Sequence, residues 1–183
     1  LRNPALGREK ECEIHPTEKP ETVLVAGGGI AGLEAAIILK KRGHNPILCE
    51  ATDTLGGQFL TAGEAPRKKE MKAAAISMAK KAERLGVDIR MNTKVTPELI
   101  EEIKPHTVMN AIGAESIVPQ ILGVEKAFVK DSHDVLDGKT EVIGNVVVIG
   151  GGMVGMETAE YLVEKGLKVT VLEMLPDICS DMG

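Results

Sequence analysis

Two glycine-rich turns carry the residues of this chain whose types and spacing could do chemistry. One lies in TVLVAGGGIAGLEAA, residues 22–36, and the other in NVVVIGGGMVGMETA, residues 145–159. Each has the spacing GxGxxG, and a glutamate, Glu50 or Glu173, follows the first glycine by 23 residues. Such a turn leaves unpaired N–H groups at a helix start, where a pyrophosphate binds, and the acid accepts hydrogen bonds from a ribose. The spacing therefore predicts two dinucleotide-binding turns.

The glycines of each turn have separate physical roles. The first permits a sharp turn, the second lets the backbone approach a pyrophosphate, and the third allows the helix to pack close to the strand. These roles belong to three pairs of equivalent positions: Gly27 and Gly150, Gly29 and Gly152, and Gly32 and Gly155.

The two turns belong to a longer internal repeat. Residues 22–50 and 145–173 align without a gap at an offset of 123 and share 11 of 29 residues. The identities include every glycine of both turns and both glutamates, which chance pairing of apolar residues would not preserve. A period of this length is too long for a solenoid, so the sequence predicts a duplicated domain.

The residues around each turn predict a strand, a helix and a second strand. Residues 22–26 are continuously apolar, as in a strand covered on both faces, and the helix from about residue 31 ends before Gly43. A short return to a strand at 46–50 makes a βαβ unit, which has parallel strands. Beyond it we expect a loop at 51–67, a helix at 68–85, extended chain at 87–95, a short helix opened by Thr96 and Pro97, a buried strand at 106–114, a short helix around 131–137 and a second βαβ unit from Asn145.

These elements predict an α/β fold with two Rossmann-like dinucleotide-binding units, each built on a parallel sheet in a three-layer arrangement. Two adjacent dinucleotide folds suit a bound FAD that is reduced by a visiting NADH, because a flavin supplies chemistry that no side chain can. No Lys or Arg follows Glu173 in EMLPDICSDM, so a 2′-phosphate is disfavoured and NADH is expected rather than NADPH. The expected organisation is an extended lead-in at 1–20, part of an FAD-binding domain at 21–114, a connector at 115–144 and the start of an NAD(P)H-binding domain at 145–183.

The loop LGGQF, residues 55–59, adds candidates beside the first turn. Its two glycines permit backbone next to a flat ligand, and Gln58 either hydrogen-bonds that ligand or remains a surface amide. Lys68 lies either near the phosphates or ring edge or at a solvated helix start. The backbone at Val95 could meet an adenine.

Composition excludes several other functions. The net charge is −5 without a basic stripe, which argues against a nucleic-acid partner, and no apolar run approaches the roughly 18 residues that span a bilayer. Three widely separated cysteines indicate reduced thiols and a cytoplasmic protein. Residues 51–65 contain no cysteine, which excludes thiol–disulfide chemistry here, and no histidine has a partner at ligand spacing, so no metal site is expected.

The order of these motifs resembles that of a known family. The order NPALGREKE, VLVAGGGIAGLEAA…LGGQF, NAIGA and VVVIGGGMVGMETAEYL…VTVLE is similar to the C-terminal part of the 2,4-dienoyl-CoA reductase and 2-enoate reductase group. That group belongs to the NADH:flavin oxidoreductases related to old yellow enzyme and shares a fold with pyridine nucleotide-disulfide oxidoreductases. The resemblance implies that an FMN-binding barrel and a [4Fe–4S] cluster precede this segment in the same protein, and that this piece alone does not reduce an enone.

The resemblance also implies which residues contact the cofactors. The FAD contacts of the group fall on Ala31, Glu50, Gln58, Lys68 and Val95, and this chain has AIG where the group usually has ATG at 111–113. With their neighbours, the remaining predicted cofactor-binding residues are Ile30, Ala51, Gly57, Gly113, Met153 and Val154. No catalytic side chain is predicted.

Three functions stay open from the sequence. The first is an FAD- and NADH-binding electron-input module of an enoate or dienoyl-CoA reductase-like flavoenzyme. The second is an electron donor similar to the small subunit of glutamate synthase. The third is a module that holds ADP as a structural element, as in relatives similar to trimethylamine dehydrogenase. A homo-oligomer is compatible with each of them.

Overall fold

The chain forms two compact units. The computed structural model describes residue 3 and residues 5–180, so the predicted lead-in at residues 1, 2 and 4 and the end of the second unit at 181–183 lie outside the described residues. One unit consists of Leu1–Gly57 and Ala75–Gly113, and the other of Gln58–Ala74 and Ala114–Gly183. Each has α/β structure with parallel strands, as the sequence predicts.

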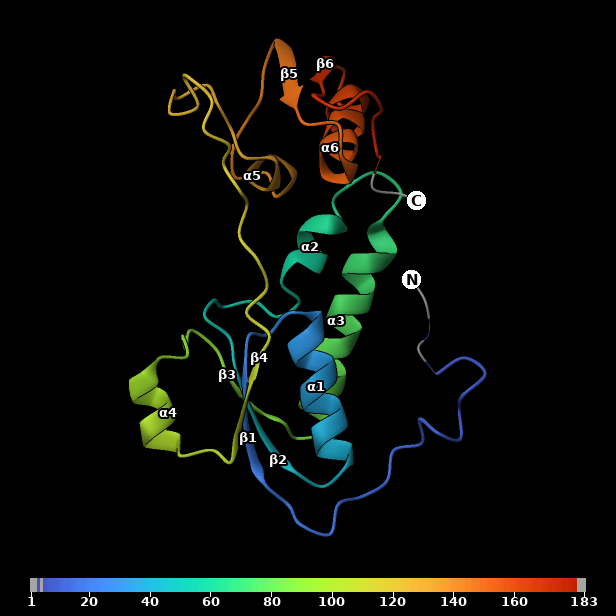
Figure 1. The fold of residues 1–183 in the computed structure, drawn as a ribbon, viewed down its shortest axis with the longest axis vertical. Helices are drawn as coiled ribbons and strands as arrows, with labels where there is room; N and C mark the ends of the chain where they lie inside the picture. Colours follow the sequence, from blue (N-terminus) through green and yellow to red (C-terminus); the bar gives the residue numbers. More distant parts are fainter. Residues whose placement is uncertain (1–2, 4, 181–183) are drawn as a thin grey trace. The chain divides into compact units, whose positions relative to one another are not determined.

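The first unit is built on a four-stranded parallel sheet with the order β3-β2-β1-β4. Figure 1 shows α1 on one side of this sheet and α4 on the other. The elements are β1 (Thr22–Ala26), α1 (Ile30–Lys41), β2 (Asn45–Cys49), α3 (Lys69–Arg84) from Ala75 onward, β3 (Asp88–Arg90), α4 (Pro97–Ile103) and β4 (Thr107–Asn110).

Apolar contacts between β1 and α1 form the core of this unit. Val25 of β1 and Leu33 and Ile37 of α1 are completely buried, and Leu48 of β2 packs into the same cluster. β1 is central because it pairs with β2 on one side and β4 on the other. The continuous apolar run of the first strand thus reflects burial on both faces, as predicted.

The capping residues recognised in the sequence predicted the helix ends correctly. Thr96 caps α4, since its hydroxyl accepts a hydrogen bond from the N–H of Leu99, and Pro97 occupies the first helical position. α1 carries Lys40 and Lys41 in its last turn, where cations favour the helix dipole, and Gly43 follows with φ +87°.

Other segments differ from the prediction. The strand predicted at 106–114 was expected to be buried, but all of β4, at one edge of the sheet, is exposed. Within the predicted loop at 51–67, Gln58–Ala62 form a short helix, α2, directly after two glycines that conceal it in the sequence. Residues 5–12 make turns, with Cys12 N–H bonded to the carbonyl of Arg8.

The second unit repeats the βαβ arrangement with a smaller sheet. It contains α2, α5 (Ser132–Leu136), β5 (Asn145–Ile149), α6 (Met153–Glu164) and β6 (Lys168–Leu172), and β5 pairs in parallel with β6. Burial alternates along both strands, and Val147 and Leu172 lie on the exposed face. One face of this sheet is therefore uncovered by the described residues.

A membrane-spanning role finds no support in the helices. Within residue 3 and residues 5–180, none of them combines the length and the apolar character that crossing a bilayer requires.

Truncation of the core contact between α1 and the sheet should destabilise the first unit. Leu33→Ala removes a fully buried side chain and leaves a cavity, so we expect a loss of about 2–5 kcal/mol in the free energy of opening. Hydrogen exchange of the β1 amides measures this. Ile76→Ala, at a half-exposed position of α3 in the same unit, is the control and should change exchange little. Equal effects of the two variants would contradict the proposed core.

Candidate functional site

The first glycine of each repeat has a backbone conformation that requires glycine. Gly27 and Gly150 both have φ +106°, which places them in a region that L side chains rarely adopt. The N–H of Gly27 donates to the carbonyl of Cys49, and the N–H of Gly150 donates to the carbonyl of Leu172, both at 2.8 Å. Each turn is therefore tied to the end of the neighbouring strand, which carries the predicted acid.

The second glycine of each repeat is not required by the protein itself. Gly29 and Gly152 precede α1 and α6 with φ −69° and −71°, values open to any residue. A Cβ at Gly29 would meet nothing closer than the Cα of Gly57 at 3.9 Å, and one at Gly152 would meet nothing described within 4 Å. Neither helix start has a side-chain cap. The free space and the uncapped N–H groups fit a pyrophosphate at each turn.

The third glycine sets how closely each helix approaches its turn. A Cβ at Gly32 would overlap the carbonyl oxygen of Gly27, and one at Gly155 would overlap that of Gly150. The helix therefore lies directly against the turn only because these positions lack side chains, which supports the role predicted for them.

Glu50, at the end of β2, is held against the first turn. Its Oε2 accepts a hydrogen bond from Gly28 N–H at 2.7 Å, and its Oε1 accepts from Thr52 N–H at 2.8 Å. Partial burial disfavours the carboxylate, but hydrogen bonds from Thr52, Gly28 and Ala51 outweigh it and lower the pKa of Glu50 below its ordinary value. An ionised acceptor thus stands beside the turn.

Glu173 repeats this arrangement at the end of β6. Its Oε2 accepts from Gly151 N–H at 2.6 Å, and its Oε1 accepts from Leu175 N–H at 2.7 Å. The hydrogen bonds from Leu175 and then Gly151 lower the pKa of Glu173. Both predicted acids are therefore ionised acceptors beside a helix N-terminus, which is the arrangement a ribose and pyrophosphate need.

The structural repeat continues into the loop that follows each acid, although the two loop sequences differ. Gly56 N–H donates to the carbonyl of Gly28 at 2.9 Å, and Cys179 N–H donates to that of Gly151 at 2.8 Å. The two donors again differ by 123 positions. Residues 51–56 and 174–179 share no identical residue, so alignment could not detect this equivalence.

Several predicted contact residues lie in the first unit, which carries the first turn. Ile30 and Ala31 begin α1, Ala51 follows Glu50, and Gly57 approaches Gly29. Val95 lies in the half-buried extended segment between β3 and α4, and Gly113 has φ +77° after β4. At the second turn, Met153 and Val154 begin α6 and are about half exposed, which leaves apolar surface at the helix start.

Gln58 and Lys68 have protein partners in the second unit. The side-chain NH₂ of Gln58 donates to the carbonyl of Ala114 at 2.6 Å, which leaves its amide oxygen as an acceptor. The ammonium of Lys68 pairs with the carboxylate of Glu157 on α6, and the side chains of both are mostly buried. Lys68 directly precedes α3 with its ammonium paired, and Glu157 is a partner that sequence reasoning missed.

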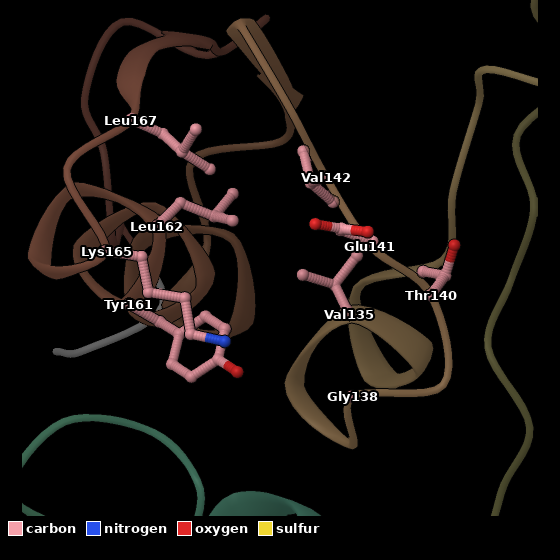
Figure 2. Close-up of a pocket in the computed structure, with 9 residues that line it drawn as sticks. All are labelled: Val135, Gly138, Thr140, Glu141, Val142, Tyr161, Leu162, Lys165 and Leu167. Carbon is pink, nitrogen blue, oxygen red and sulfur yellow. The ribbon is translucent and has the colours of Figure 1, made fainter.

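A pocket of about 350 Å³ lies at the other end of α6 from its glycine turn. Figure 2 shows Tyr161 and Leu162 of α6, and Lys165 directly after this helix, on one side and Val135 of α5 on the other. The Lys165 ammonium lies 4.3 Å from the centre of the Tyr161 ring. This pocket is separate from the residues that fit a dinucleotide.

The lowered pKa of Glu50 predicts an acid-dependent loss of stability. Because its folded-state pKa is lower than its unfolded-state pKa, the stabilisation is present above the unfolded pKa and is lost as pH falls through the folded one. Urea unfolding of the first unit at a series of pH values should show this loss, and Glu50→Gln should flatten it. Glu83→Gln, which removes an exposed carboxylate from α3, is the charge-matched control. An unchanged profile for Glu50→Gln would contradict the assignment.

Two protein families match the chain, one over each part. A family described as FAD dependent oxidoreductase matches residues 22–127, and one described as Pyridine nucleotide-disulphide oxidoreductase matches residues 98–183. These matches overlap at residues 98–127, and together they support an α/β fold that binds a flavin and a pyridine nucleotide.

Similar proteins are oxidoreductases of greater length. NADH oxidase of Thermoanaerobacter brockii is 44% identical over 98% of this chain and 28% of its own length. Cinnamate reductase of Clostridium sporogenes is 38% identical over 96% of this chain and 26% of its own length. The solved structure of 2-naphthoyl-CoA reductase with 2-naphthoyl-CoA is 32% identical, with a TM-score of 0.92 over 99% of this chain and 28% of that one.

The chain thus spans about a quarter of the length of these relatives. They confirm the resemblance to the enoate reductase group that the sequence motifs indicated. The chain belongs to the FAD dependent oxidoreductase family.

Proposed function

We propose that this chain is the FAD- and NADH-binding electron-input module of a longer flavoenzyme that reduces activated C=C bonds. The observation that carries the proposal is the pair of turns in which an uncapped helix N-terminus lies beside a carboxylate held by the turn itself. One turn fits one dinucleotide, so two turns fit a donor and an acceptor of hydride.

We assign FAD to the first turn and NADH to the second. The FAD dependent oxidoreductase match begins at the first strand, whereas the second turn falls in the pyridine nucleotide match. Gly56 and Gly57 add close-fitting backbone over the first turn, which suits a cofactor that stays bound. In this proposal, residues 21–114 contribute to the FAD domain, 115–144 connect, and 145–183 begin the NADH domain.

The chain contributes binding and orientation to the reaction. A flavin, when bound, supplies hydride acceptance and onward electron transfer, which no side chain provides. The N–H groups at the starts of α1 and α6 hold pyrophosphates, and Glu50 and Glu173 accept hydrogen bonds from ribose hydroxyls. Gln58 presents an amide oxygen beside Gly57, and Lys68 is held by Glu157 at the start of α3.

The second turn favours NADH over NADPH for an electrostatic reason. The pKa of Glu173 is lowered, so its carboxylate carries a negative charge where a 2′-phosphate would lie. Residues 174–180, MLPDICS, supply no Lys or Arg to offset this repulsion. A 2′-phosphate would therefore be placed beside an uncompensated carboxylate.

The acceptor of the electrons belongs to the rest of the longer protein. The names cinnamate reductase and 2-naphthoyl-CoA reductase belong to relatives of which this chain spans 26% and 28%. We infer an unsaturated acid or acyl-CoA as the substrate class, with FMN and a [4Fe–4S] cluster in the remaining length. The free thiols of Cys12, Cys49 and Cys179 fit a reducing, cytoplasmic compartment.

Reduction of the bound flavin by NADH tests the proposed function. Purified protein reconstituted with FAD should lose its oxidised flavin absorbance under anaerobic titration with NADH. NADPH should require about a tenfold or greater concentration, because its 2′-phosphate would lie beside the ionised Glu173 carboxylate. Protein that binds ADP but no flavin would support the structural-ADP alternative instead. Equal bleaching by both nucleotides would contradict the assigned preference.

Alanine at the second glycine of each turn should separate the two sites. Gly29→Ala places a methyl group where the FAD pyrophosphate is proposed, and we expect at least about tenfold weaker FAD binding by fluorescence titration. Gly152→Ala should leave FAD affinity unchanged and raise the NADH concentration needed for half reduction by a similar factor.

The two variants are matched controls for each other. Neither new methyl group meets a described protein atom closer than 3.9 Å, and both backbones suit alanine, so both proteins should fold. Loss of both FAD binding and reduction by NADH in both variants would show that the turns are not independent cofactor sites.

A further inference from the structure

The two equivalent carboxylates are not held equally by the protein. Each accepts one N–H from its turn on Oε2 and one N–H from two residues downstream on Oε1. Glu50 accepts one more hydrogen bond, from the hydroxyl of Thr52 to Oε1 at 2.8 Å. The position equivalent to Thr52 is Leu175, which has no hydroxyl to donate.

The loop around Thr52 fixes this additional donor. The N–H of Asn92 donates to the carbonyl of Thr52 at 2.9 Å, which ties the loop to the chain after β3. The N–H of Thr54 approaches the Thr52 hydroxyl oxygen at 3.4 Å, and the carbonyl of Thr54 lies 3.2 Å from it. The carboxylate of Glu50 is closer and charged, so it is the stronger acceptor for the single hydroxyl proton.

The hydroxyl of Thr52 restricts which oxygen of Glu50 faces a ligand. Oε1 receives both the N–H and the hydroxyl of Thr52, so its lone pairs are used by the protein. Oε2 receives the N–H of Gly28 and lies beside the turn, with acceptor capacity left. A hydroxyl group at the first turn therefore meets an acceptor that cannot rotate away.

We propose that Thr52 is a positioning residue that aims the Glu50 carboxylate at the adenosine ribose of the dinucleotide on the first turn. This inference rests on the proposed function, because it needs a nucleotide at that turn. Leu175 donates its N–H to Glu173 but has no hydroxyl to add, so the second turn holds its ribose less firmly. The difference matches a retained nucleotide at one turn and an exchanging nucleotide at the other.

Substitution of Thr52 tests this inference by binding alone. FAD affinity is measured by flavin fluorescence, and ADP affinity at the same turn by displacement of FAD. Thr52→Val removes the hydroxyl while keeping the shape of the side chain, and it should weaken both FAD and ADP about five- to tenfold. Thr52→Ser retains the hydroxyl and should restore affinity to within about twofold. Thr54→Val is the matched control, because the Thr54 hydroxyl bonds to Asp53 rather than to Glu50.

Deoxynucleotides distinguish an effect of Thr52 on the orientation of the Glu50 carboxylate from a general loosening of the loop. In the wild type, 2′-deoxy-ADP or 3′-deoxy-ADP should bind several-fold more weakly than ADP, and in Thr52→Val this penalty should shrink because the carboxylate is no longer aimed. A merely structural role would leave the penalty unchanged. Circular dichroism of each variant checks folding, and Thr52→Ala repeats the test should the valine variant not fold.

The outcomes distinguish this inference from the proposed function. Equal or tighter FAD and ADP binding by Thr52→Val, or an undiminished deoxynucleotide penalty, would overturn the role of Thr52 alone. Wild-type protein that binds ADP but no FAD would overturn the proposed function, and calorimetry with ADP would still decide the role of Thr52. Binding of neither nucleotide would overturn both.

Discussion

A glutamate carboxylate bonded to the N–H of a glycine turn is the interaction on which each site depends. It joins the end of one strand to the loop that leaves the neighbouring strand, so the acid and the helix N-terminus hold a fixed relation. Gly28 and Gly151 leave room for this contact, because a Cβ there would lie 3.0 Å and 3.2 Å from Oε2 of Glu50 and Glu173. Negative charge is tolerated there because backbone N–H groups solvate it, which lowers the pKa of both acids.

The same backbone arrangement serves two different environments. At the first turn, the end of β4 and the loop at Gly56 crowd the glycines, and a Cβ at Gly27 would overlap the carbonyl of Ala111. At the second turn, no described atom lies within 4 Å of the Cβ position at Gly150. The two turns therefore share a backbone arrangement but differ in the described residues around them.

Sequence reasoning succeeded where a local physical signal was strong. The glycine spacing, the apolar strand at 22–26 and the Thr96–Pro97 helix start each depend on residues close in the chain, and each was predicted correctly. It failed where a long-range contact decided the outcome. The apolar residues of β4 did not reveal that this strand is exposed at a sheet edge, and α2 follows two glycines that normally indicate a loop.

The sequence by itself determined the two βαβ units, their glycine turns and the acid that follows each, because these depend on backbone conformations that only glycine permits and on short-range periodicity. Only the tertiary structure decided how each carboxylate is held, because the hydroxyl of Thr52 and the N–H of Leu175 reach the acids only when the loop folds back onto the strand end. It also decided that Lys68 pairs with Glu157, 89 residues away, and that the repeat continues to Gly56 and Cys179. Contacts between residues distant in the chain follow from packing, and composition and periodicity do not encode them.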